Sequence, residues 1–183
     1  MKCYFFGTFN PVHIGHIEIA KFIEKEKKYG EVIFVPAYNP PHKKVLNYKD
    51  RVNMLKINNL KVNEIESRQE GVTYTYKIIE KLGKCYFIIG YDAFLEIETW
   101  KNPEYLKENL YFLVLPRKTV KNLNEFEKLK QKGYNFEILN FEQIDISSEE
   151  IRRKKANKES LNGLVTKETE KYINEHRLYE TMA

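Results

Sequence analysis

The sequence predicts an α/β fold with a doubly wound, mainly parallel sheet and helices on both faces. Four short apolar runs predict its strands, at residues 3–6, 32–35, 85–89 and 111–115. The runs are rich in aromatic and β-branched residues and lack polar alternation, as expected of strands covered on both faces. Helical patterns separate them, which is the order typical of β-α-β units. We therefore predict a single Rossmann-like domain over residues 1–183.

The first predicted helix follows the first strand. His16, Ile19, Ala20 and Ile23 fall at i, i+3, i+4 and i+7, so they form one stripe that faces a sheet. Gly30 is well placed to end this helix, because glycine readily adopts the left-handed conformation at helix ends.

The remaining elements are predicted in the same way. A helix follows Asn47, and a shorter one over 74–82 is ended by Gly83. Weaker patterns predict strands near 62–66 and 136–139, and helices near 123–131, 148–154 and 166–175. The last part of the domain, about 146–183, is therefore expected to be helical.

Composition narrows the functional class. Lys and Arg total 31 against 26 Asp and Glu, and the charges interleave along the chain. Interleaved charges are typical of solvated helix faces, so we expect no nucleic-acid partner, although a basic nucleic-acid-binding module stays an alternative. Cys3 and Cys85 lie in apolar runs and are predicted to be buried thiols. No apolar stretch approaches the roughly 20 residues that span a bilayer, and no secretory signal is seen, so we expect a cytoplasmic protein without a membrane partner.

The strongest chemical signal follows the first predicted strand. Gly7 permits a sharp exit from it, and Asn10 and Pro11 favour a turn. His13 and His16 stand three residues apart at the start of the helix, so both imidazoles can face one ligand. The helix N-terminus offers free N–H groups beside them, which favours a phosphate. The alternative is that both histidines only cap and pack.

Other nucleotide and metal motifs do not fit. The chain has neither GxxxxGK[ST] nor GxGxxG, which argues against a Walker-type NTPase and a dinucleotide-dependent dehydrogenase. His13 and His16 lack the spacing and the glutamate of HExxH, so we expect no protein-held metal.

The segment Gly7-Thr8-Phe9-Asn10-Pro11-x-His13-x-Gly15-His16 resembles the signature of the HxGH nucleotidyltransferases. Within this superfamily the chain is most similar to the bacterial nicotinate mononucleotide adenylyltransferases. The similarity continues, in order, through residues 36–43, 51–55, 73–75, 87–92, 99–100, 146–152 and 172–179.

The resemblance implies an adenylyltransferase of NAD biosynthesis. ATP and nicotinate mononucleotide would give nicotinate adenine dinucleotide and pyrophosphate, by in-line attack of the mononucleotide phosphate on the ATP α-phosphorus. Mg²⁺ would arrive on the ATP phosphates. Another acceptor, nicotinamide mononucleotide or phosphopantetheine, stays open, as do a nucleotide sensor without turnover and a homo-oligomer.

The resemblance also implies roles for particular residues. The catalytic set is His13, His16, Lys43 and Arg152. The ATP-binding set is Gly7, Thr8, Phe9, His13, His16, Gly90, Asp92, Arg117, Ser147, Ser148 and Arg152. The acceptor set is Asn39, Lys43, Thr75 and Trp100.

Purely structural readings remain for several of these residues. Asp92 suits a helix cap, and Ser147 with Glu150 has the spacing of a capping box. Trp100 could pack in the core, whereas Lys43 and Arg117 could be solvated surface residues.

Four places depart from the family pattern, and one of them is Leu115-Pro116-Arg117-Lys118, which replaces an Arg-Pro-Gly turn. Phe6 stands where a glycine is usual, Glu149 replaces a hydroxyl residue and Asn10 replaces the commoner aspartate. Asn10 keeps a side-chain acceptor that can shape the turn, so we expect little loss from that change.

Overall fold

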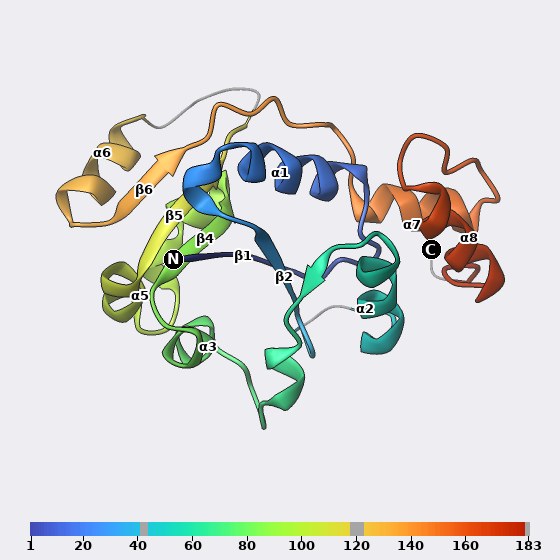
Figure 1. Cartoon of the computed structure of the whole chain (residues 1–183), viewed down its shortest axis with the longest axis horizontal. Coiled ribbons are helices and arrows are strands. Elements are labelled where there is room, and N and C mark those ends of the chain that lie inside the picture. The colour runs from blue at the N-terminus through green and yellow to red at the C-terminus, as the bar shows by residue number, and fades with distance from the viewer. Residues whose placement is uncertain (41–43, 118–122, 182–183) are drawn as a thin grey trace.

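The computed structural model describes residues 1–40, 44–117 and 123–181, and its centre is a six-stranded sheet (Figure 1). All strand pairs within it are parallel, and the strand order is β3-β2-β1-β4-β5-β6. The strands are β1 (Lys2–Gly7), β2 (Val32–Pro36), β3 (Lys61–Val62), β4 (Cys85–Gly90), β5 (Leu110–Leu115) and β6 (Asn135–Ile138). The predicted α/β, doubly wound fold is confirmed, and the predicted mainly parallel sheet is parallel throughout.

Helices connect the strands. They are α1 (Ile14–Lys25), α2 (Tyr48–Ile57), α3 (Thr75–Leu82), α4 (Tyr91–Leu95), α5 (Pro103–Asn109), α6 (Leu123–Gln131), α7 (Ser148–Ala156) and α8 (Lys167–Glu175). Short 3₁₀ turns lie at η1 (Lys27–Tyr29), η2 (Ile65–Arg68) and η3 (Ile97–Thr99). The segments α4 and α5, between β4 and β5, are too short to show a full apolar period and were not predicted.

Successive strand residues face opposite sides of the sheet and build two cores. Cys3 and Phe5 of β1 pack with Ile19 and Ile23 of α1, whereas Tyr4 belongs to the core on the other face. Helices α3, α4, α5 and α6 supply that second core, and Figure 1 shows α1 and α3 on opposite sides of the sheet. Both faces are therefore covered, which explains the apolar strand runs.

Two predicted boundaries are wrong. The strand near 62–66 ends at Val62, because the Asn63 side chain accepts the Ile65 N–H at 3.0 Å and turns the chain into η2. Helix α1 ends at Lys25, and Gly30, with φ 73°, closes η1 instead. Gly83 does end α3, where its N–H donates to the Ile79 carbonyl.

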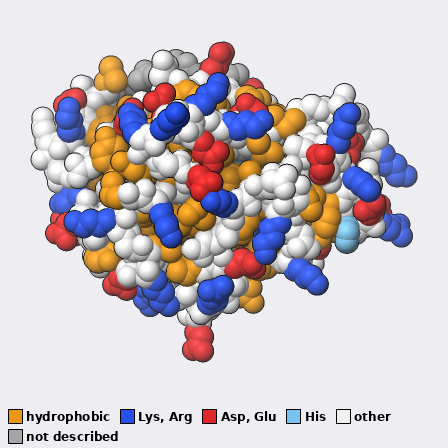
Figure 2. Space-filling model, viewed as in Figure 1, with side chains coloured by type: hydrophobic (Ala, Val, Ile, Leu, Met, Phe, Trp, Pro, Cys, Tyr) orange, Lys and Arg blue, Asp and Glu red, His pale blue; other side chains and the backbone are white. Residues whose placement is uncertain are grey.

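Both cysteines are buried free thiols, as predicted. Burial raises the pKa of Cys3 and that of Cys85 to about 12, so both stay protonated at neutral pH. In the part of the chain that the structure describes, no helix has the length and apolar character to cross a bilayer. Figure 2 shows one face of the molecule, where Lys and Arg side chains lie among Asp and Glu side chains.

The strand order sets the place of a ligand site. The chain leaves β1 for β2 on one side, and β4 lies on the other side of β1. Loops that follow β1 and β4 therefore diverge, and ligands of such sheets bind beyond the carboxyl ends of the strands at this point.

Candidate active site

A cavity of about 530 Å³ lies beyond the carboxyl end of β1. It is bounded by the loop from β1 to α1, the segment before α2 and the N-terminus of α7. Its lining residues are Thr8, Phe9, Asn10, His16, Lys44, Val45, Ser148, Glu149 and Arg152. Five residues of the predicted catalytic and ATP-binding sets, Thr8, Phe9, His16, Ser148 and Arg152, are thus brought together.

His13 and His16 form a stacked pair at the start of α1. Their ring centroids lie 3.7 Å apart, and the His13 N–H donates to His16 Nδ1 at 3.2 Å. Since Nδ1 of His16 accepts a hydrogen bond, the proton of its neutral ring sits on Nε2. The cavity therefore has a neutral N–H donor, whereas His13 lies buried behind His16 with no partner for its Nδ1 among the described residues.

Burial keeps both rings neutral. It lowers the pKa of His13 to about 4 and holds the pKa of His16 well below the ordinary value, with a smaller contribution from His13 in the second case. A neutral imidazole still donates one N–H. The pair is therefore uncharged in the empty cavity and can still donate a hydrogen bond to a phosphate oxygen.

Two glycines make room for these rings. A Cβ on Gly15 would lie 2.9 Å from the His13 ring, and one on Gly7 would lie 2.8 Å from the Phe9 ring. Any side chain at either position would displace an aromatic ring of the site. Close packing of rings, rather than backbone approach to a ligand, accounts for both glycines.

The N-terminus of α7 forms the wall opposite α1. Ser147 caps the helix by accepting the Glu150 N–H at 3.1 Å, so this part of the capping-box reading is present. Ser148 and Arg152 turn towards the β1–α1 loop and donate to the carbonyls of Pro11 and Asn10, each at 2.8 Å. Arg152 also lines a neighbouring cavity of about 390 Å³ with Ser147 and Arg153. The two cavities thus share the Arg152 guanidinium.

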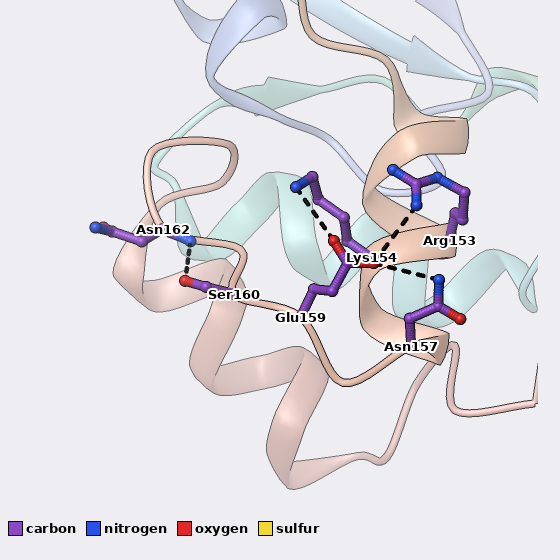
Figure 3. Close-up of polar contacts among 6 residues, drawn as sticks. All are labelled: Arg153, Lys154, Asn157, Glu159, Ser160 and Asn162. Carbon is purple, nitrogen blue, oxygen red and sulfur yellow. Dashed lines mark hydrogen bonds and ion pairs between the residues drawn. The ribbon is translucent and has the colours of Figure 1, made fainter.

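The far end of α7 is held by Glu159 (Figure 3). Its carboxylate lies 3.5 Å from both Arg153 Nη1 and Lys154 Nζ, and it accepts from Asn157 Nδ2 at 3.2 Å. These contacts lie at the surface, so each adds little stability.

Three other predicted ATP-binding residues lie at the ends of β4 and β5. Asp92 and Arg117 are both exposed and form an ion pair there. Gly90 is exposed, and a Cβ at its position would meet nothing within 4 Å. Arg117 also lines a cavity of about 250 Å³ with Phe141. These residues lie outside the lining of the His16 cavity.

The predicted acceptor residues are spread over three segments. Trp100 is half-buried after η3, with its ring 6.2 Å from that of Phe87, and Thr75 begins α3. Lys101 lies 6.0 Å from the ring of Tyr74, so the segments that carry Trp100 and Thr75 adjoin. Asn39 is exposed after β2, and Lys43 lies outside the described residues.

Arg51 belongs to the family resemblance over residues 51–55, but sequence reasoning assigned it no role in the site. It is fully buried in α2, and it donates to the carbonyls of Thr8, Tyr38 and Leu46 at 2.8, 3.3 and 3.1 Å. It therefore ties the loops after β1 and β2 to the start of α2. The available signal was a lone arginine next to the apolar Val52 in the predicted helix after Asn47.

Similarity to known proteins agrees with this geometry. The model of a family described as cytidylyltransferase-like matches residues 4–154. A "Probable nicotinate-nucleotide adenylyltransferase" of Fusobacterium nucleatum is 39% identical, over 91% of this chain and 93% of the relative. One of the same name from Thermoanaerobacter is 35% identical, over 95% and 92%. The chain belongs to the nicotinate-nucleotide adenylyltransferase family. The predicted resemblance and the predicted enzyme class, nucleotidyltransferase, are confirmed.

The fold of this family recurs in solved structures. A Plasmodium falciparum nicotinic acid mononucleotide adenylyltransferase complexed with NaAD matches with a TM-score of 0.80 at 23% identity, over 98% of this chain and 97% of that one. The same enzyme complexed with APC matches with a TM-score of 0.77 at 22% identity, over 98% and 96%. At these identities the likeness concerns the fold.

Proposed function

We propose that this chain transfers the adenylyl group of ATP to nicotinate mononucleotide in NAD biosynthesis. The observation that carries the proposal is the cavity beyond β1, where the His16 imidazole and the Arg152 guanidinium converge at two helix N-termini. Free N–H groups, helix dipoles and a guanidinium all favour a polyphosphate. Membership of the family is the reason for choosing ATP as the adenylyl donor and nicotinate mononucleotide as the acceptor.

The attack needs no strong general base. An oxygen of the mononucleotide phosphate, already anionic, attacks the α-phosphorus of ATP, and the bond from that phosphorus to the bridging oxygen breaks as pyrophosphate leaves. His16 would donate its Nε2–H to a phosphate oxygen, with His13 behind it, while Arg152 would offset charge on the leaving group. Lys43 is assigned to the acceptor phosphate by family resemblance alone.

The rest of the ATP site is assigned partly from the lining of the cavity and partly from family resemblance. Thr8, Phe9 and Ser148 line the same cavity, and Ser147 caps the helix that bounds it. Gly7 holds the strand exit, while Gly90, Asp92 and Arg117 would take the adenosine at the ends of β4 and β5. Trp100, Thr75 and Asn39 would take the nicotinate nucleotide, with the indole ring stacked on the pyridine.

Mg²⁺ enters as part of the substrate. Among the described residues no three His, Cys, Asp or Glu side chains gather into a metal site. Phosphate oxygens and water are the ligands that Mg²⁺ prefers, so the ion would travel with ATP. We also propose that residues 1–183 act as one nucleotidyltransferase domain, since Asn58 at the end of α2 donates to Thr169 of α8. Membership of the family supports a cytoplasmic location.

Pyrophosphate release tests the proposal. Magnesium-ATP is offered with nicotinate mononucleotide, nicotinamide mononucleotide or phosphopantetheine, and release should strongly prefer the first. His16→Ala, checked for folding by circular dichroism, should lower turnover by about a hundredfold or more, as loss of one transition-state donor does elsewhere. If release prefers another acceptor, that compound and not nicotinate mononucleotide is the substrate. ATP binding without pyrophosphate release would indicate a nucleotide sensor.

A further inference from the structure

Three segments from distant parts of the sequence meet at Asn10. Its side chain is buried, and its Oδ1 accepts from the Tyr179 hydroxyl at 2.9 Å and from the Leu46 N–H at 3.4 Å. Its main-chain carbonyl accepts from Arg152 Nη1 at 2.8 Å. The position of the Arg152 guanidinium in the cavity therefore depends on where the Asn10 turn lies.

Tyr179 reaches Asn10 from the chain beyond α8. It is 2% exposed, and burial raises the pKa of its hydroxyl, which stays protonated and able to donate. Its φ of 62° is an unfavourable left-handed conformation for a tyrosine. Backbone strain of this kind persists only where the surroundings over-determine the position, so the tail is held firmly against the turn. Helix α8, which precedes Tyr179, lies beside α7 in Figure 1, and Lys155 Nζ of α7 donates to Asn174 Oδ1 of α8 at 2.7 Å.

We propose that Tyr179 is a positioning residue for adenylyl transfer, which fixes the Asn10 turn so that Arg152 faces the polyphosphate. The proposal deepens the function proposed above and rests on it. Tyr179 does not line the cavity, so it acts through Asn10 and Arg152 rather than by touching ATP. The C-terminal tail, at the opposite end of the sequence from the histidine motif, thereby contributes to the affinity for ATP.

The test compares two tyrosines of the C-terminal region. Tyr179→Phe removes one hydroxyl and should raise both the KM and the Kd for magnesium-ATP about tenfold, because a buried acceptor loses its donor and the guanidinium shifts. Tyr172→Phe is the matched control. Its hydroxyl bonds to Asp50 at 2.7 Å and to Asn53 at 3.0 Å on α2, away from the cavity lining. It should lower the melting temperature but leave KM and Kd within about twofold of wild type.

A double-mutant cycle distinguishes positioning from general stability. In an Arg152→Ala background, Tyr179→Phe should cause no further loss of ATP affinity, because the group it positions is gone. Equal effects with and without Arg152, or equal ATP affinities for Tyr179→Phe and Tyr172→Phe, would overturn the proposal. Replacing Tyr179 with 4-aminophenylalanine keeps a donor and should preserve wild-type ATP affinity. That variant decides the question if Tyr179→Phe does not fold, and loss of ATP affinity in it would overturn the proposal.

The two proposals fail in different ways. Absence of pyrophosphate release from the wild-type enzyme would contradict the proposed function. The calorimetric Kd for magnesium-ATP is measured without turnover, so it tests the role of Tyr179 in either case.

Discussion

At the scale of single residues, the site depends on a histidine that is neutral because it is buried. His13 lies between Gly15 and the His16 ring, and its pKa falls to about 4 since burial disfavours the charged form. In the unfolded chain the imidazole takes up a proton below pH 6.5. Between these two pH values the unfolded chain therefore binds a proton at His13 that the folded chain does not bind.

This difference in proton binding predicts how stability changes with pH. A depressed folded-state pKa gives stability that is complete above pH 6.5 and is lost as the pH falls towards 4. For His13 the loss should reach about 3 kcal/mol, and His16 changes in the same direction. Urea unfolding of wild type and His13→Gln from pH 7.5 to 4 measures it. The free energy of unfolding of the variant should depend less on pH than that of wild type. Parallel curves for the two proteins would contradict a depressed pKa of His13.

At the scale of elements, Arg51 joins parts that the sheet alone leaves apart. The loop after β1 gives it one carbonyl, and the connection between β2 and α2 gives it two. A guanidinium presents several donors in a fixed plane, so one side chain can satisfy all three. Burying that cation is favourable only because the carbonyls compensate for lost water.

Removing the guanidinium should therefore cost far more than removing a surface cation. Arg51→Met removes the donor to the carbonyls of Thr8, Tyr38 and Leu46 and should lower the free energy of unfolding by about 3 kcal/mol or more. It should also raise the KM for ATP, since Thr8 lines the cavity. Lys56→Met is the control on the same helix, because the exposed pair of Lys56 with Glu64 contributes about 1 kcal/mol or less. Equal losses of unfolding free energy for the two variants in urea would contradict this role of Arg51.

At the scale of the whole molecule, the cavity is assembled from both ends of the chain. The β1–α1 loop, the segment before α2 and the N-terminus of α7 all line it, and Tyr179 supports it from the tail. A ligand that binds only this assembled state must stabilise the entire fold.

Magnesium-ATP should accordingly raise the melting temperature. At a hundred times its Kd, ATP adds about 2.7 kcal/mol, which corresponds to roughly 5 to 10 °C for a chain of this size. Differential scanning fluorimetry measures the shift. Arg152→Ala should reduce it, whereas Lys128→Ala, in an exposed ion pair on α6, should not. A shift unaffected by Arg152→Ala would place ATP elsewhere.

Local patterns were sufficient for most of the fold and for part of the site. The apolar runs predicted β1, β2, β4 and β5, because burial on both faces leaves a pattern readable in a few residues. The histidine motif and the Ser147–Arg152 segment were likewise recognised, and the structure places His16 and Arg152 at one cavity. Short segments such as α4 carry too few residues to show a period.

The sequence by itself determined the α/β class, the family and the segment that holds His13 and His16, because these follow from residues close together in the chain. Only the tertiary structure decided that Arg51 ties two loops together through three carbonyls and that Tyr179 holds Asn10. Contacts between residues 169 positions apart leave no local periodicity. They exist because folding brings distant polar groups out of water, where each must find a partner.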